Sequence, residues 1–211
     1  MKTSFLSALT CTALVLATAP NVAQATPRTK MVLAPQAPSA AKRMNQRGNE
    51  NLAMAQQVGT WDVTETVWDS PTATPKTTRG LIAERQMVGS MLQEIIHSPA
   101  GSTGANIKRI DYLTFNRVEG HWQYVSMDAR APVGLMPATS FDRGTGGKIT
   151  LLFTPFALAG SGSDVSGQML RMDTVIARQG PNRDLKQQHF MLADGTGTSW
   201  LAHQYAYTRR R

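Results

Sequence analysis

The stretch GTWDVTETV, residues 59–67, marks the point at which the sequence changes from helical to strand periodicity. Before it, residues 49–58 carry apolar side chains at helical spacing, and Asn49 is a suitable N-cap. Within it, Trp61 and Glu65 share one face of an alternating pattern, as in a strand with one buried side. The pattern therefore predicts a short helix over residues 49–58 and a first β-strand immediately after it.

Turn signals rich in Gly, Pro, Asp and Asn recur from residue 59 to the end of the chain. About ten short strands between these turns, with no helix among them, predict an all-β domain over residues 59–208. A sheet of that many strands normally curls, splits or closes. The strand-like runs lie at roughly 60–68, 77–86, 88–97, 107–117, 120–129, 136–142, 147–154, 166–178, 184–193 and 198–208.

The faces of the predicted strands distinguish a closed barrel from a sandwich of two sheets. In residues 107–115, one face carries apolar side chains interrupted by Arg109 and Asp111, and the other carries Ile110 and Tyr112. Such a mixed face suits a partly polar lumen better than a dry interface between two sheets. We therefore expect an antiparallel up-and-down β-barrel of about ten strands, with the sandwich as the alternative.

Residues 1–25 have the pattern of a secretory signal peptide. A basic residue precedes an apolar run over residues 5–19, and the segment ends in an A-x-A motif at residues 23–25. The apolar run is shorter than the roughly 20 residues that a membrane helix needs. Cleavage at this motif would also remove Cys11, the only cysteine. We expect an exported protein, periplasmic or extracellular, with no transmembrane segment after cleavage.

The net charge of +8 is concentrated at the ends of the chain. Most of it lies in residues 26–48, a Pro- and Ala-rich stretch that we interpret as a basic linker, and in the basic tail at residues 209–211. Residues 59–208 contain 13 basic and 13 acidic residues, so this part of the chain is neutral. Charged tails of this kind favour solubility or weak surface adhesion over a specific polyanion site, and we expect no nucleic-acid partner.

The start of the first predicted strand, Gly59-Thr60-Trp61, resembles the G-x-W signature of lipocalins and related barrels. That resemblance implies that Trp61 closes the floor of the barrel and that Arg209, near the end of the last strand, packs across its ring. The chain is also similar to an uncharacterised lipocalin-like (calycin-type) bacterial family, domain of unknown function 1579. The similarity covers residues 59–208 and implies a barrel and an exported context, but it transfers no activity. It is carried by Gly59 to Val63, Asp111-Tyr112 and Trp122 to Asp128.

Six residues are candidates for contacts with a ligand in the lumen. If Trp61 points inward, Glu65 does too, and a carboxylate there needs a cationic partner. Such a pair would serve either as an anchor for a ligand head group or as an internal ion pair, and aromatic rings would either line a pocket or fill the core. The cations considered as partners are Arg109, Arg130 and Arg171. The candidate ligand-binding residues are Glu65, Arg109, Trp122, Tyr124, Asp128 and Trp200.

The histidines allow one test for a metal site. If the turn at residues 194–197 has two residues, His189 lies opposite Ala202; if it has three, His189 faces His203. Even the second register supplies two ligands, and no H-x-x-x-H or C-x-x-C spacing accompanies them. A G-x-S-x-G nucleophile motif is absent as well. We therefore predict no metal, no cofactor and no catalytic residue.

Together these patterns predict an exported protein that holds a small, partly apolar molecule in a barrel lumen, with residues 155–166 as a candidate lid. Two alternatives remain open. One is a cell-envelope interaction or structural module with a filled barrel. The other is a cofactor-free enzyme that uses lumen carboxylates such as Glu65 or Asp128. The sequence leaves the ligand and the oligomeric state undetermined.

Overall fold

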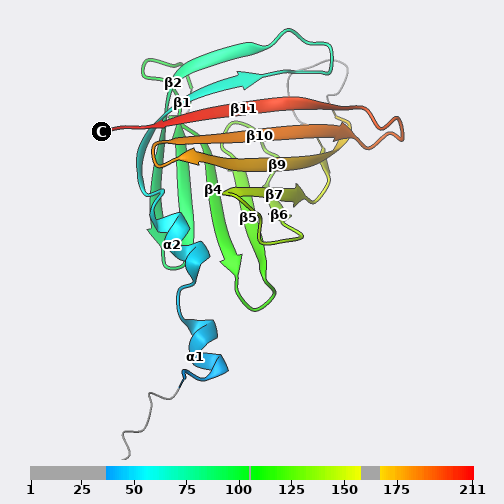
Figure 1. The fold of residues 1–211 in the computed structure, drawn as a ribbon. Helices are drawn as coiled ribbons and strands as arrows, with labels where there is room; N and C mark the ends of the chain where they lie inside the picture. Colours follow the sequence, from blue (N-terminus) through cyan, green and yellow to red (C-terminus); the bar gives the residue numbers. More distant parts are fainter. Residues whose placement is uncertain (1–36, 105, 158–166) are drawn as a thin grey trace, which may run out of the picture. The chain divides into compact units, whose positions relative to one another are not determined.

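Ten strands follow one another around a closed antiparallel barrel in the computed structural model, which describes residues 37–104, 106–157 and 167–211 (Figure 1). A short eleventh strand pairs along one of them. The strands are β1 (Gly59–Val67), β2 (Lys76–Val88), β3 (Met91–His97), β4 (Ile107–Asn116), β5 (His121–Asp128), β6 (Leu135–Thr139), β7 (Lys148–Phe153), β8 (Phe156–Ala157), β9 (Met169–Gly180), β10 (Arg183–Leu192) and β11 (Ser199–Arg209).

The predicted barrel is confirmed, and the two-sheet alternative is wrong. Each strand from β1 to β7 pairs with the next, β9 pairs with β7 and β10, and β11 pairs with β10 and β1. The short β8 adds to β9. Closure removes the unpaired edges that an open sheet of this size would leave. The predicted signal peptide, residues 26–36 of the linker and residues 158–166 of the candidate lid lie outside the described residues.

Two short helices, α1 (Ala40–Asn45) and α2 (Asn49–Ala55), precede the barrel. α2 is the predicted helix; Met54 on it is fully buried in the barrel core. It contacts β2, β3 and β4 and lies at one end of the barrel (Figure 1), which we call the helix end. α1 falls in the stretch interpreted as linker. This helix was not predicted, because none of its residues is buried and no apolar stripe marks it.

Trp61 closes the helix end and is 1% exposed. Its indole N–H donates to the carbonyl oxygen of Gln57 (3.0 Å), and the Arg209 guanidinium lies 4.3 Å from the ring centroid. Arg209 also donates to the carbonyl oxygens of Gln56 (2.5 Å) and Val58 (2.6 Å), just beyond the last turn of α2. The predicted packing of Arg209 on Trp61 is confirmed. The same arginine satisfies carbonyls that a helix C-terminus leaves unpaired.

Gly59 explains why this motif begins with a glycine. Its φ of +135° is a conformation that residues with a side chain rarely adopt. A Cβ at this position would also lie 3.0 Å from Nη1 of Arg209. A side chain at residue 59 would therefore displace the arginine from Trp61.

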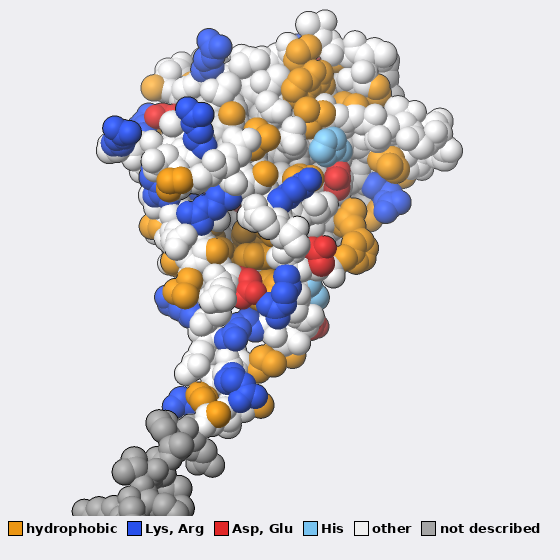
Figure 2. All heavy atoms as spheres, in the orientation of Figure 1, with side chains coloured by type: hydrophobic (Ala, Val, Ile, Leu, Met, Phe, Trp, Pro, Cys, Tyr) orange, Lys and Arg blue, Asp and Glu red, His pale blue; other side chains and the backbone are white. Residues whose placement is uncertain are grey.

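Basic side chains are scattered over the face shown in Figure 2, among hydrophobic ones, and do not gather in one patch. No described helix is long and apolar enough to cross a lipid bilayer.

Candidate functional site

Eight charged residues are buried inside the barrel, counting only the described residues, and none of these residues is more than 7% exposed. Four are cationic and four are anionic, so their formal charges balance. Buried ions are tolerated when each has a partner, because an unpaired charge in the interior is very costly. The cations are Arg85, Lys108, Arg109 and Lys186, and the anions are Glu65, Glu94, Asp111 and Asp184.

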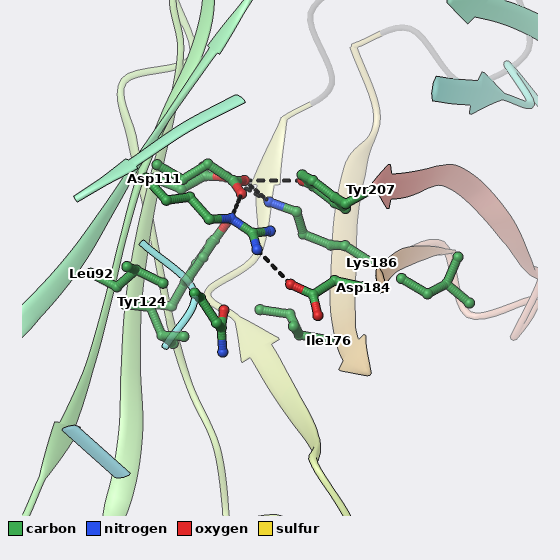
Figure 3. Close-up of a pocket in the computed structure, with 12 residues that line it drawn as sticks. Leu92, Asp111, Tyr124, Ile176, Asp184, Lys186 and Tyr207 are labelled. Atoms are coloured by element: carbon green, nitrogen blue, oxygen red, sulfur yellow. Dashed lines mark hydrogen bonds and ion pairs between the residues drawn. The ribbon is translucent and has the colours of Figure 1, made fainter. Parts of the chain in front are cut away.

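At the helix end, Lys186 joins two carboxylates from the opposite wall. Its Nζ lies 2.6 Å from Glu94 and 2.8 Å from Asp111, while Arg85 contacts Glu94 (2.6 Å) and Asp184 (2.5 Å). In Figure 3, Lys186 points toward Asp111 across the lumen, and a dashed line joins Asp184 to the guanidinium group of its partner. Burial by itself would lower the pKa of Lys186, but Asp111 and Glu94 outweigh it and raise that pKa. These contacts therefore form one connected ionic network with its lysine charged.

The network fills the helix end of the lumen. The remaining cavity among its side chains has a volume of about 30 Å³, which is room for about one water molecule. The Tyr124 hydroxyl lines this cavity and has no hydrogen-bond partner among the described residues. Paired charged side chains therefore occupy this end of the lumen and leave no room for a ligand larger than water.

Glu65 is held by Lys108 and His203. The Lys108 ammonium group contacts its carboxylate directly, and Nδ1 of His203 lies 3.3 Å from Oε1. None of the three arginines that the sequence analysis considered is the partner. A register shift opposite Ile96 and His97 explains why: it leaves Lys108 as an extra residue beside Arg109, and both side chains become buried.

Electrostatic surroundings shift the pKa values of both partners of Glu65. Burial, together with the guanidinium groups of Arg130 and Arg109, lowers the pKa of Lys108 to about 7. Burial, together with Arg109 and Lys108, lowers the pKa of His203 to about 3. The imidazole is therefore neutral at neutral pH. Because an ionised carboxylate can only accept a hydrogen bond, the contact with Glu65 places the imidazole proton on Nδ1.

His203 makes the stability of the fold sensitive to acid. An exposed histidine in the unfolded chain has a pKa near 6.5. As the pH falls, the unfolded state therefore binds a proton at this position, whereas the folded state does not. Lowering the pH from 7 to 5 should cost the wild type about 2 kcal/mol more than the His203→Gln variant. Urea denaturation at both pH values measures this difference. His189→Gln, on the outer face, should retain the wild-type loss; equal losses in wild type and His203→Gln would contradict the assignment.

The opposite end of the barrel, which we call the mouth, contains a separate cavity of about 100 Å³. One part of its wall is polar and charged, and the other is apolar. This combination is what small-molecule sites share: apolar walls with a few polar groups placed to fix orientation. The polar lining residues are Arg109, Ser126, Asp128, Arg130, Gln188, His203 and Tyr205; the apolar ones are Ala131, Val133, Met136, Phe156, Met172 and Phe190.

The structure brings two of the six predicted site residues into the mouth cavity. Arg109 and Asp128 line it and are paired neighbours on β4 and β5. Asp128 accepts hydrogen bonds from Nε (3.0 Å) and Nη2 (2.7 Å) of Arg130. Burial would raise the pKa of Asp128, but these contacts with Arg130 lower it. The Asp128 carboxylate is therefore a weak base, and both of its oxygens already accept hydrogen bonds from Arg130.

The other four predicted residues lie elsewhere. Glu65 belongs to the ion pair described above, and Tyr124 lines the small cavity at the helix end. The Trp122 indole N–H donates to the carbonyl oxygen of Arg143 (2.9 Å), at a hollow of about 170 Å³ beside α2. The Trp200 indole N–H donates to the carbonyl oxygen of Trp68 (3.0 Å). These aromatic rings are part of the barrel core, which was the other reading of them.

Sequence reasoning missed most of the ionic network, although part of it carried a signal. Arg85 is in phase with apolar Leu81 and Ala83, and Glu94 is in phase with Leu92 and Ile96. A charged residue in register with a buried face indicates an internal ion pair. Asp184, Lys186 and Gln188 on β10 carried no such signal, because they share a face with one another before Phe190.

Both predicted registers of the last hairpin are wrong. His189 pairs with Leu201, and Gln188 pairs with His203 across a register shift. The loop after β10 is longer than either prediction assumed. Because of the register shift, His189 faces outward beside Asp173 while His203 faces the lumen. Across the described ranges, no three His, Cys, Asp or Glu side chains lie together as a metal site would require.

A larger hollow of about 490 Å³ lies at β7, β9 and β10. Most of its lining side chains, including Thr150, Arg171 and His189, are on the outer face of the sheet, so it is not part of the lumen.

Comparison with models of protein families finds none that matches the chain, and comparison with curated proteins finds no match either.

Proposed function

We propose that this chain is an exported, lipocalin-like protein that binds a small, partly apolar molecule in the mouth of its barrel. The mouth cavity carries this proposal, because it combines a polar floor with a wall of aliphatic, thioether and aromatic side chains. Export is supported by the signal-peptide pattern of residues 1–25. Kinship with lipocalin-like barrels is supported by the contact between Trp61 and Arg209.

The size of the cavity limits the ligand. Typical ligand pockets measure roughly 300–1,000 Å³. The mouth cavity is closer to an engineered apolar cavity of about 150 Å³ that takes up benzene. The occupant is therefore about the size of a single ring or a short chain, or it inserts one end of a longer molecule.

The lumen carboxylates do not favour the enzyme alternative. Glu65 is paired with Lys108, and Asp128 is held through two nitrogens by Arg130. A general base needs an available lone pair and a pKa near the working pH. The alternative of an interaction module with a filled barrel is favoured by one observation, the packed helix end. If the mouth cavity binds no ligand, this alternative is the better explanation of the fold.

Filling the mouth tests the proposal. Val133 lines the cavity, whereas Leu135, two residues further on, is 68% exposed and does not. Native mass spectrometry of the protein from its own envelope should show a retained small molecule in the wild type and in Leu135→Trp. Val133→Trp should lose it. Retention by Val133→Trp would place the ligand elsewhere, and bare protein in all three samples would support the interaction module.

A further inference from the structure

We propose, building on the binding function above, that the mouth cavity holds its ligand by a carboxylate group bound between Arg109 and Tyr205. The ligand class is then a small monocarboxylate with an aromatic ring or a short alkyl chain.

The hydrogen bonds of Arg109 leave part of its guanidinium without a partner among the described residues, although its side chain is only 6% exposed. Its Nη1 donates to the Tyr205 hydroxyl (3.1 Å) and to Oε1 of Gln188 (3.4 Å), and its Nε lies 3.1 Å from Asp111. Its Nη2 has no hydrogen-bond partner within the described part of the chain. Guanidinium cannot lose its proton in a protein, so this buried donor favours an acceptor from outside the chain.

The two carboxylates near Arg109 already have other partners. Asp111 is shared, since Lys186 contacts one of its oxygens (2.8 Å) and the Ser126 hydroxyl donates to the other (2.6 Å). Asp128, the other carboxylate lining the cavity, is held by Arg130. Neither carboxylate is therefore dedicated to Arg109. An anionic ligand would meet an incompletely neutralised guanidinium, whose planar set of N–H groups matches a carboxylate.

The hydroxyl group of Tyr205 lies beside the Arg109 guanidinium. The hydroxyl oxygen accepts from Arg109, and among the described residues it also lies 3.5 Å from Nδ1 of His203. That nitrogen carries a proton, which it donates to Glu65, and therefore cannot accept a second proton from Tyr205. The Tyr205 proton is therefore available to a ligand in the cavity that this residue lines. One carboxylate can accept from Arg109 through one oxygen and from Tyr205 through the other.

Apolar side chains form another part of the wall of the mouth cavity. Phe156, Phe190, Met136 and Met172 line the cavity from four different strands. Thioether and aromatic side chains adapt their packing to the shape of an apolar group. With a cavity of about 100 Å³, the group that follows the carboxylate is the size of a phenyl ring or a short chain.

Calorimetric titration of the full chain with benzoate and with benzamide, its neutral analogue of the same shape, tests the inference. Wild type should bind benzoate at least tenfold more tightly than benzamide. Tyr205→Phe keeps the ring that lies 4.4 Å from the Arg109 guanidinium and removes the hydroxyl, so it should weaken benzoate binding severalfold and leave benzamide binding unchanged. Arg109→Lys should abolish the preference for benzoate, because an ammonium lacks the planar fork.

The control is Arg183→Lys, at an exposed position outside the cavity lining, which should bind benzoate as wild type does. If Arg109→Lys does not fold, Tyr205→Phe decides alone. Equal binding of benzoate and benzamide would overturn the carboxylate assignment while leaving a ligand in the mouth. A benzoate preference that survives in both variants would also overturn it, and so would a failure of benzoate to bind. The Val133→Trp experiment then judges the binding function separately.

Discussion

Replacing Lys186 with Met should lower the free energy of unfolding by about 4 kcal/mol. The Lys186 side chain is 4% exposed and neutralises both Glu94 and Asp111. Without it, two carboxylates remain buried with less compensation, which is costlier than the loss of the ion pairs themselves. Urea denaturation at pH 7 measures the change. Lys148→Met, at an exposed position on β7, is the matched control and should change stability by less than about 0.5 kcal/mol.

A second variant distinguishes the effect of losing the lysine from the effect of leaving carboxylates buried with too little positive charge nearby. Glu94→Gln combined with Lys186→Met removes one charge of each sign and leaves Arg85 with Asp184 (2.5 Å). If uncompensated buried charge causes the loss of stability, the free energy of unfolding of the double variant should be about 1–2 kcal/mol higher than that of Lys186→Met. A double variant that is less stable by the sum of the two single losses would show that packing, not charge balance, governs this end of the barrel.

The barrel could be predicted because its signals are local. Alternation along residues 59–67 and turns at regular intervals define hairpins, and many consecutive hairpins favour closure. The contact between Trp61 and Arg209 was predictable for a different reason: resemblance supplied a pairing between residues at opposite ends of the chain. The α1 helix escaped prediction, because it buries no side chain and therefore leaves no periodic pattern.

The candidate site was less predictable, because it depends on register. The partner of Glu65 is Lys108, which faces inward because of an irregularity in β4. No residue type in this stretch indicates that irregularity. The inward position of His203 depends on a similar shift between β10 and β11. A change of one residue in register moves a side chain from one face to the other. Arg109 was identified as a cation within a strand that could pair with Glu65, but its unpartnered nitrogen is found only from the three-dimensional arrangement of its neighbours.

Trp61→Ala should destabilise the protein by about 4 kcal/mol, as removal of a large buried aromatic ring generally does. Trp61 is 1% exposed, and the guanidinium groups of Arg85 and Arg209 lie 4.7 Å and 4.3 Å from its ring centroid. Its loss leaves a cavity beneath α2 and removes the donor to Gln57. Trp61→Phe keeps an aromatic face and should cost about half as much. Thermal and urea denaturation measure both.

A double-mutant cycle between Trp61→Phe and Arg209→Ala isolates the stacking contact from the other roles of the arginine. Arg209→Ala also removes hydrogen bonds to the carbonyl oxygens of Gln56 and Val58, so its own cost includes the loss of the α2 terminus. A coupling energy of about 1 kcal/mol would assign that amount to the interaction of guanidinium with indole beyond its interaction with phenyl. Zero coupling would mean that Arg209 stabilises the helix end through the carbonyls alone. Because the mouth lies at the other end of the barrel, Trp61→Phe should still bind benzoate as wild type does.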